Sequence, residues 1–204
     1  MAKKSSKKKA VKVAKKSVKR VVKAKPAAKK AAAKTSAPPV RAGAPSLKKE
    51  LLSRMAREHQ TTLRVMRAFP ADQGHFQPHP RSQSAKALMW TFVGEQGLSH
   101  GALDGEIKFD MKPAPETLDE IIAAYDEGVR GLMARIEKTP DPHFGRTVKF
   151  MVGPGQVGDV PVADMLWIML LDAVHHRGQL SVYLRMAGGK VPSIYGPSAD
   201  EPWH

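Results

Sequence analysis

An acid and a histidine near the C-terminus have a spacing at which they could do chemistry together. Asp172 and His176 are four residues apart, which places both side chains on one face of a helix and within reach of one ion or one proton. They interrupt a line of apolar residues that recurs at helical spacing. Burying a carboxylate and an imidazole without partners costs several kcal/mol, so we expect polar partners inside the protein. The apolar members of this line are Met165, Met169, Leu180 and Tyr183.

His59 and Glu95 interrupt the apolar stripes of two earlier segments in the same way. Helix bundles build metal sites from inward Glu and His residues on facing helices. One interpretation is therefore a divalent metal bound by His176, Asp172, His59 and Glu95, with His176 and Asp172 as the catalytic residues. The other is a hydrogen-bonded pair without a metal, in which Asp172 orients His176 as a base or both residues are purely structural.

Four segments with the apolar periodicity of helices must position these residues. Ser46 is a predicted N-cap of the first segment, and Gly188 and Gly189 end the fourth. The stretch 146–160 alternates in polarity and is rich in Gly, which predicts either a hairpin or an irregular loop. We predict an all-α four-helix bundle over residues 47–204. The helices span about residues 46–69, 82–97, 117–138 and 162–187.

Two features near the C-terminus concern packing around the bundle. Gly178 lies inside the fourth predicted helix, where Gly costs about 1 kcal/mol relative to Ala. We expect it to mark the close approach of a neighbouring backbone. Residues 188–204 contain three prolines, and we expect this irregular segment to lie across the bundle instead of extending a helix.

The charge of the chain is unevenly distributed. The 204 residues carry a formal net charge of +15, yet residues 1–47 contain 16 Lys or Arg and no acid, and the remainder is nearly neutral. The absence of cysteine excludes disulfides, a thiolate nucleophile and zinc sites built on Cys. No run of 18 apolar residues occurs, so we expect no transmembrane segment. A cytoplasmic location follows as an expectation.

Residues 1–46 form a basic segment without aromatic or large aliphatic residues after Met1. Such a chain cannot offset the entropy of ordering, so we predict a disordered tail. It is similar to the Lys/Ala/Pro tails of linker histones and bacterial histone-like proteins. Spaced lysines displace counterions from a polyphosphate, which predicts nonspecific nucleic-acid binding and association with the nucleoid. The predicted contacts are Lys3, Lys4, Lys7, Lys8, Lys9, Lys15, Lys16, Lys19, Arg20, Lys29 and Lys30.

Other interpretations of this tail remain open. A solubility tail or an anchor to another anionic surface has the same charge requirement. A mitochondrial transit peptide fits less well, because Lys outnumbers Arg 14 to 2 over residues 1–46 and the apolar residues are only Val and Ala.

The run His175-His176-Arg177-Gly178-Gln179, followed by Tyr183-Leu184-Arg185 and Gly188, resembles the HHRGQ signature of the DinB/YfiT-like superfamily. The resemblance covers about residues 46–204 and implies a four-helix bundle that is often a homodimer. It also implies a divalent metal held by three histidines, one on the second helix and two in an H-x-x-x-H pair on the last. Thiol-dependent transferases and metal-dependent hydrolases occur in this superfamily, whose name alone suggests damage-inducible expression.

Transferred residue by residue, the last-helix pair falls on Asp172 and His176, and the second-helix ligand falls on Thr91. Two of the three histidines are therefore absent. Glu95, one turn beyond Thr91, and His59 are the replacements that we consider. An oxygen-rich set would shift the preference from Zn²⁺ or Ni²⁺ toward Fe²⁺ or Mn²⁺.

The resemblance thus predicts a metal-dependent hydrolase or thiol-dependent transferase that acts on an unknown small molecule. The alternative is a noncatalytic, DNA-associated helical bundle that has lost the metal. A third interpretation is a small-molecule binding module whose pocket is closed by residues 190–197.

Overall fold

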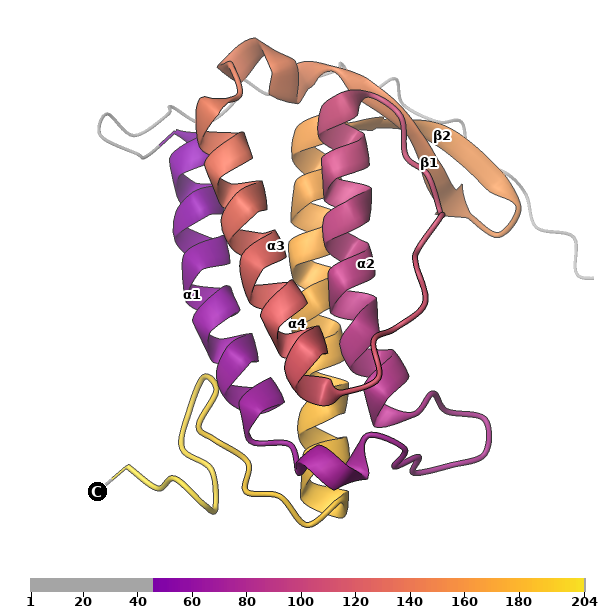
Figure 1. Cartoon of the computed structure of the whole chain (residues 1–204). Coiled ribbons are helices and arrows are strands. Elements are labelled where there is room, and N and C mark those ends of the chain that lie inside the picture. Colours follow the sequence, from indigo (N-terminus) through magenta and orange to yellow (C-terminus); the bar gives the residue numbers. More distant parts are fainter. Residues whose placement is uncertain (1–45, 204) are drawn as a thin grey trace, which may run out of the picture. The chain divides into compact units, whose positions relative to one another are not determined.

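The computed structural model describes residues 46–203, which form four long helices and a short hairpin (Figure 1). The predicted tail lies outside the described residues except for Ser46, and so do all the basic residues predicted to contact nucleic acid. None of the helices within residues 46–203 combines the length and the hydropathy that a membrane span requires. The elements are α1 (Leu47–Arg67), η1 (Ala71–Gln73), α2 (Ala85–Asp104), α3 (Leu118–Lys138), η2 (Asp141–Gly145), β1 (Thr147–Gly153), β2 (Gln156–Pro161) and α4 (Val162–Met186).

Side chains that precede the helices start three of them. Ser46 and Ser84 each accept a hydrogen bond from a backbone N–H three residues later, at α1 and α2. Thr117 and Glu120 form a reciprocal capping box at α3. These caps satisfy backbone donors that would otherwise lack partners in the first turn. The predicted N-cap at Ser46 is confirmed.

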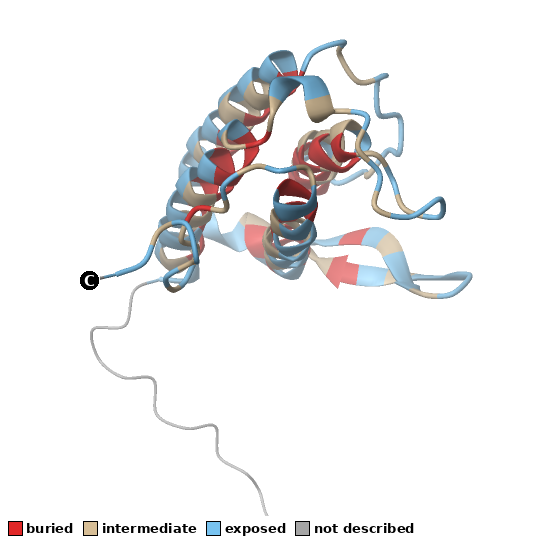
Figure 2. Ribbon diagram, turned by 90° about the horizontal axis from the view of Figure 1, so that it is seen from below, coloured by how far each residue is buried: buried red, intermediate tan, exposed pale blue. Residues whose placement is uncertain are grey.

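The four helices surround an interior that is divided along its length. α1 packs against α3 and α4, and α2 packs against the same two helices, so α1 and α2 are diagonal. Figure 2 shows the buried residues gathered on the inner sides of the helices. They form two apolar clusters, one around Leu63, Phe92 and Leu180 and the other around Met55 and Met165. A layer of buried polar residues lies between these clusters in sequence on α1, α2 and α4: His59, Thr62, Glu95, Gln96, Ser99 and Arg177.

The second helix is longer than predicted. It continues past residue 97 to Asp104 and ends at Gly105, whose φ of 90° is accessible mainly to glycine. Gly97 favoured an earlier end, but Ser99, Ala102 and Leu103 are buried in the continuation. Burial in the tertiary structure therefore outweighs the low helix propensity of Gly97 and Gly101.

The glycine-rich stretch before α4 is an antiparallel hairpin, so the fold is mostly helical with a small sheet and not all-α. Val148 of β1 lies opposite Val160 of β2, and both are buried in the second apolar cluster. Gly155 turns the chain with a φ of 68°. The sequence is compatible with either a hairpin or an irregular loop here, and the structure contains the hairpin.

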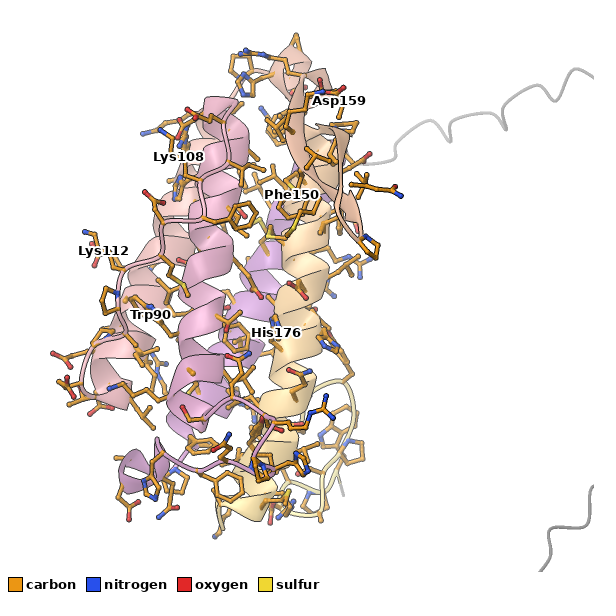
Figure 3. The ribbon with its side chains drawn as sticks, turned by 90° about the vertical axis from the view of Figure 1, so that its right-hand side faces the viewer. Trp90, Lys108, Lys112, Phe150, Asp159 and His176 are labelled. Carbon is orange, nitrogen blue, oxygen red and sulfur yellow. The ribbon has the colours of Figure 1, made fainter. Side chains whose placement is uncertain are left out.

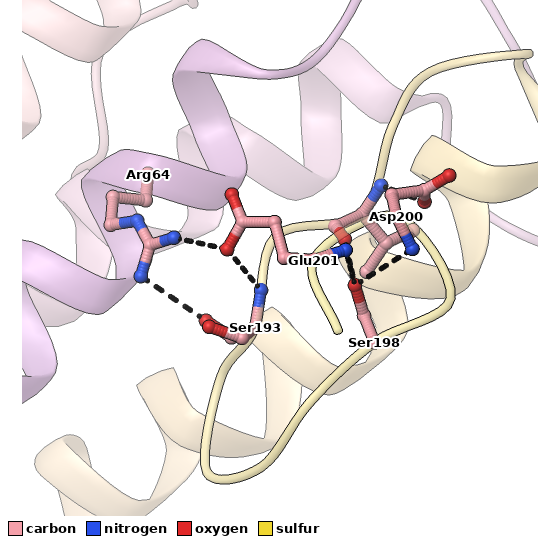
Figure 4. A network of polar contacts seen from close by, with 6 residues as sticks. Arg64, Ser193, Ser198, Asp200 and Glu201 are labelled. Carbon is pink, nitrogen blue, oxygen red and sulfur yellow. Dashed lines mark hydrogen bonds and ion pairs between the residues drawn. The ribbon is translucent and has the colours of Figure 1, made fainter. Parts of the chain in front are cut away.

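The C-terminal segment packs across the ends of α1 and α4, as predicted. Val191 and Ile194 contact the first apolar cluster. Figure 4 shows Arg64 of α1 bound to Glu201, which also accepts a hydrogen bond from the backbone N–H of Ser193. The expectation for Gly178 was wrong, because no described atom lies within 4 Å of a Cβ placed there.

Candidate metal centre

Three of the four predicted ligands come together between α2 and α4. Glu95, Asp172 and His176 each offer one ligand atom, and these atoms all lie within 4.8 Å of one another. Nδ1 of His176 is 2.5 Å from Oε1 of Glu95 and 3.9 Å from Oδ1 of Asp172. Figure 3 shows His176 between the two helices. Glu95 of α2 thus lies beside Asp172 and His176 of α4.

The helices position these residues by their apolar stripes. Glu95 is 6% exposed because it continues the buried stripe that contains Leu88 and Phe92. The ring of Phe92 meets His176 edge to face, with 6.1 Å between centroids. Asp172 lies one turn before His176 at the rim of the site, where its side chain is 43% exposed. The cluster thus has a buried inner side and an open outer side.

Burial and hydrogen bonding shift the protonation of the Glu95–His176 pair. Burial raises the pKa of Glu95 to about 7, although the nearby His176 acts in the opposite direction. The hydrogen bond to Glu95 raises the pKa of His176, against the effect of its own partial burial. Because the two groups are in contact, their protons are lost in steps that belong to the pair. The pair can hold and exchange a proton near neutral pH.

One atom of this cluster lacks a partner. Oε2 of Glu95 is buried and accepts no hydrogen bond from any residue in the described part of the chain. Leaving a buried acceptor unsatisfied costs about 1–3 kcal/mol. A divalent cation would satisfy it, and two carboxylates with one imidazole suit Fe²⁺ or Mn²⁺ better than softer metals. The donor set and the unpaired oxygen therefore fit a metal.

An interior cavity gives a second means of satisfying that oxygen. A space of about 50 Å³ borders Glu95, His59, Thr62 and Tyr125. This volume can hold water, which requires polar partners of this kind. A buried water and a metal ion are therefore the two candidate partners for Oε2.

His59 lies in a different polar contact. Its Nε2 is 2.9 Å from Oδ1 of Asp126 on α3, although the ring N–H is not aligned for a hydrogen bond. Burial lowers the pKa of His59, while Asp126 acts to raise it. The structure thus places His59 outside the three-residue cluster. Helical periodicity gave its inward direction but not the helix that it faces.

The hydroxyl of Thr91 takes part in a hydrogen bond within α2, which it donates to the carbonyl of Ala87 one turn earlier. Thr91 and Asp172 both line a neighbouring pocket. The two positions at which the resemblance expected histidines therefore border the same space.

This pocket has a volume of about 870 Å³ and opens beside Glu95 and Asp172. α2 forms one wall and the chain from Asp104 to Lys112 forms the other. Nε1 of Trp90 donates to the carbonyl of Lys112, with 2.7 Å between the atoms, and so ties the two walls together (Figure 3). The lining is both apolar and charged, and includes Trp90, Val93, Leu98, Phe109, Met111, Lys108 and Lys112.

Sequence reasoning missed the pocket and the buried Arg177. The chain from 105 to 117 has no periodicity, so nothing in it predicted which helix it covers. Nη1 of Arg177 is 2.7 Å from Oε2 of Glu58, and Nη2 donates to the hydroxyl of Tyr195. Arg177 directly follows His176 on α4, so its side chain is rotated by about 100° from that of His176 and faces α1. This offset was the signal in the sequence that could have revealed its position.

The fold and the site define a helical-bundle protein with a carboxylate and histidine cluster between two helices. Residues 43–203 match the DinB family. The chain therefore belongs to the DinB family.

Three relatives illustrate the similarity. The uncharacterized protein YrdA of Bacillus subtilis is 43% identical over 117 residues, which are 56% of this chain and 67% of YrdA. The crystal structure of a DinB-like protein from Bacillus cereus has a TM-score of 0.60 at 18% identity, covering 72% of this chain and 97% of that one. The DinB-like protein YjoA of B. subtilis has a TM-score of 0.59 at 17% identity, covering 71% and 97%. At these identities the two solved structures show the fold alone.

Proposed function

We propose that this chain is a metal-dependent hydrolase or thiol-dependent transferase whose cation is held by Glu95, Asp172 and His176. The observation that carries the proposal is the buried Oε2 of Glu95, unpaired within residues 46–203, in a cluster whose ligand atoms lie within 4.8 Å of one another. The adjacent 870 Å³ pocket gives a small molecule access to the exposed side of Asp172. Largely preformed apolar pockets with a few polar groups are the usual place for such substrates.

The residues of the site have different roles in this proposal. A bound cation would polarise a substrate or lower the pKa of a water or thiol. Glu95 and His176 can store a proton at Oε1 or Nδ1 and return it, because burial raises the pKa of Glu95 to about 7 and the hydrogen bond to Glu95 raises the pKa of His176. The edge of Phe92 fixes the imidazole plane. Glu95 is 6% exposed, so the inner side of the site is shielded from bulk water.

The test is metal content measured by elemental analysis, after metal-free purification and reconstitution with Fe²⁺, Mn²⁺, Zn²⁺ or Ni²⁺. We expect one equivalent of Fe²⁺ or Mn²⁺ and a melting temperature that a chelator lowers. Glu95→Gln and Asp172→Asn should both reduce the bound metal. Asp126→Asn is the matched control, since it alters the other carboxylate and histidine pair of the same bundle. No stoichiometric metal and a melting temperature indifferent to chelator would refute the proposal.

A noncatalytic bundle is the second candidate, and a specific observation favours it. Glu95 and His176 already hydrogen-bond directly, and Thr91 and Asp172 replace two histidines of the superfamily pattern. In that case His176→Ala would lower the melting temperature without affecting metal content or turnover. The metal measurement above separates the two candidates.

Nucleic-acid binding through the basic residues of 1–46 remains a prediction that rests on their charge and spacing. The full chain and a chain that begins at residue 47 should be compared for retention on duplex DNA at increasing salt. We expect retention by the full chain alone, with an affinity that falls steeply as salt rises. Equal retention of both chains would reject a role for the tail.

A further inference from the structure

The 870 Å³ pocket is a slot between α2 and a strap formed by residues 105–112. Figure 1 shows the strap running along α2 toward the start of α3. A Cβ added at Gly101 would lie 2.7 Å from the carbonyl oxygen of Glu106. A Cβ added at Gly94 would lie 2.5 Å from Sδ of Met111. The strap therefore lies against α2 at two separate points, and a glycine of α2 makes room for it at each.

Between these two contacts the surface of α2 is open. Gly94, Gly97 and Gly101 recur at steps of three and four residues, so they lie on one face of the helix. No described atom lies within 4 Å of a Cβ added at Gly97. The floor of the slot is thus a stretch of helix without side chains. This shape gives room for a long and narrow ligand that lies flat on α2 beneath the strap.

The walls of the slot are apolar and partly aromatic. The ring of Phe109 on the strap stacks on that of Phe150 of β1, with 6.0 Å between centroids, so the hairpin covers one face of this ring. Apolar walls bind methylene groups by removing them from water. The faces of Trp and Phe rings also attract cations. The wall side chains are Trp90, Val93, Leu98, Phe109 and Met111.

Carboxylates outnumber cations along the slot. Asp104 pairs with Arg135 outside the lining, and Glu106 pairs with Lys108. Burial lowers the pKa of His100, so this lining residue adds no positive charge at neutral pH. The slot is therefore more negative than residues 48–204 as a whole, which are nearly neutral. The acids are Glu95, Asp104, Glu106, Asp110 and Asp172, and the bases are Lys108 and Lys112.

The inner end of the slot contains a carboxylate oxygen that needs a partner. The side chain of Glu95 is 7% exposed, and its Oε2 accepts no hydrogen bond from residues 46–203. Asp110 on the strap makes no ion pair within the same residues, and it is the acid that a metal bound at Glu95 and Asp172 would leave free. Both positions favour a ligand that donates hydrogen bonds or carries positive charge.

From these observations we infer that the slot binds an unbranched aliphatic amine, a small molecule with an ammonium group on a methylene chain. The chain fits the glycine floor and the apolar walls, and the ammonium group fits the excess of carboxylates. A ligand with a carboxylate in place of the ammonium would be repelled. As the identity of a substrate this inference rests on the proposed function, whereas binding of an amine to the metal-free protein does not.

Isothermal titration of the full, metal-free chain with octylamine, octanol and octanoate tests the inference, because these probes share one chain length and differ in charge. We expect octylamine to bind at least about tenfold more tightly than octanol, as one hydrogen bond to a charged group would provide. Octanoate should bind most weakly. The chain has a net charge of +15, so nonspecific attraction would favour octanoate instead. Octanol or octanoate binding as tightly as octylamine would overturn the inference.

Filling the floor of the slot tests the location of the amine. Gly97→Leu places a side chain in open space on an exposed part of α2, and leucine is the better helix former, so the fold should be kept. We expect this variant to lose octylamine binding without a fall in melting temperature. Gly131→Leu is the matched control, since Gly131 is exposed on α3 and also has open space around it. Octylamine binding to Gly97→Leu at wild-type affinity would overturn the location.

The role of Asp110 is tested with Mn²⁺ present. Asp110→Asn should weaken octylamine binding by about tenfold, because it removes the charge on the strap that faces the ammonium group. Asp164→Asn, at an exposed acid outside the lining, should not. Equal affinities of these two variants would overturn the role of Asp110.

The outcomes also separate this inference from the proposed function. Octylamine binding by a chain that takes up no stoichiometric metal would refute the proposed function and support the amine slot. Stoichiometric metal without octylamine binding would do the reverse.

Discussion

Nδ1 of His176 lies 2.5 Å from Oε1 of Glu95, and this contact joins α4 to α2 inside the polar layer of the bundle. Burial raises the pKa of Glu95 from 4.5 to about 7, so the folded state binds this proton more tightly than the unfolded state does. The pKa of His176 is also raised, so its stabilising contribution is present at low pH and lost as pH rises through the folded value. Both pKa shifts therefore make the folded protein less stable as pH rises.

We therefore expect the metal-free protein to lose stability as pH rises from about 4.5 to about 7. The loss is on the order of a few kcal/mol in the free energy of unfolding. Glu95→Gln should flatten this dependence, because the amide keeps the shape of the side chain but does not ionise. Urea unfolding of both proteins across this range measures it, with exposed Glu116→Gln as the control. A wild-type profile that is flat or rises with pH would contradict the prediction.

Metal affinity should change with pH in the opposite direction. A cation competes with the protons on Glu95 and His176, so binding should strengthen as pH rises through the same range. Titration of metal-free protein with Mn²⁺ at several pH values measures this, with proton release on binding as an independent readout. Affinity that is independent of pH would mean that these two residues do not hold the metal.

Replacing Thr91 and Asp172 by histidine should change the metal preference. With His176, the double variant Thr91→His/Asp172→His carries the three histidines that the superfamily pattern expects. Imidazole ligands favour Zn²⁺ or Ni²⁺ relative to an oxygen-rich set. Competition between Mn²⁺ and Zn²⁺, read by elemental analysis, should shift toward Zn²⁺ in the double variant. Thr91→Ser, which keeps a hydroxyl on α2, should leave the preference unchanged.

The sequence predicted the inward direction of the site residues better than their neighbours. Glu95 and His176 were found because each interrupts an apolar stripe, and a stripe reports which side of a helix is buried. His59 satisfies the same rule, but it lies against Asp126 on α3. Periodicity contains no information on which helices are adjacent, and here α1 and α2 are diagonal. Only the packing of the whole bundle shows that Glu95 and His176 meet whereas His59 faces Asp126.

Segments without periodicity were predicted least well. The chain from 105 to 117 forms a pocket wall through single contacts, such as Trp90 to the carbonyl of Lys112. A backbone carbonyl can accept a hydrogen bond whatever its side chain, so the sequence gives no signal for this contact. The end of α2 was misplaced for a related reason, since burial of Leu103 is a long-range effect.

Removing Arg177 should destabilise the protein strongly. Its side chain is 1% exposed and pairs with Glu58, which is itself 13% exposed. Arg177→Met would leave that carboxylate largely buried without its cation, at a cost of about 3–5 kcal/mol. Arg185→Gln is the control, because Arg185 and Asp200 form an ion pair at the surface, where solvent screens the two charges. Thermal unfolding of both variants measures the difference, and similar melting temperatures would refute a special role for Arg177.

Two glycines on α3 should respond oppositely to the same substitution. A Cβ at Gly128 would lie 1.8 Å from Oε1 of Gln96, a buried side chain whose amide donates to the carbonyl of Tyr125. Gly128→Ala must displace the buried end of Gln96, at a cost of about 1–3 kcal/mol that exceeds the gain of up to about 1 kcal/mol from helix propensity, so we expect a net loss of stability. Nothing lies within 4 Å of a Cβ at Gly131, so Gly131→Ala should gain up to about 1 kcal/mol from helix propensity alone. Opposite shifts in melting temperature would support this packing of α3 on α2, and a stabilising Gly128→Ala would contradict it.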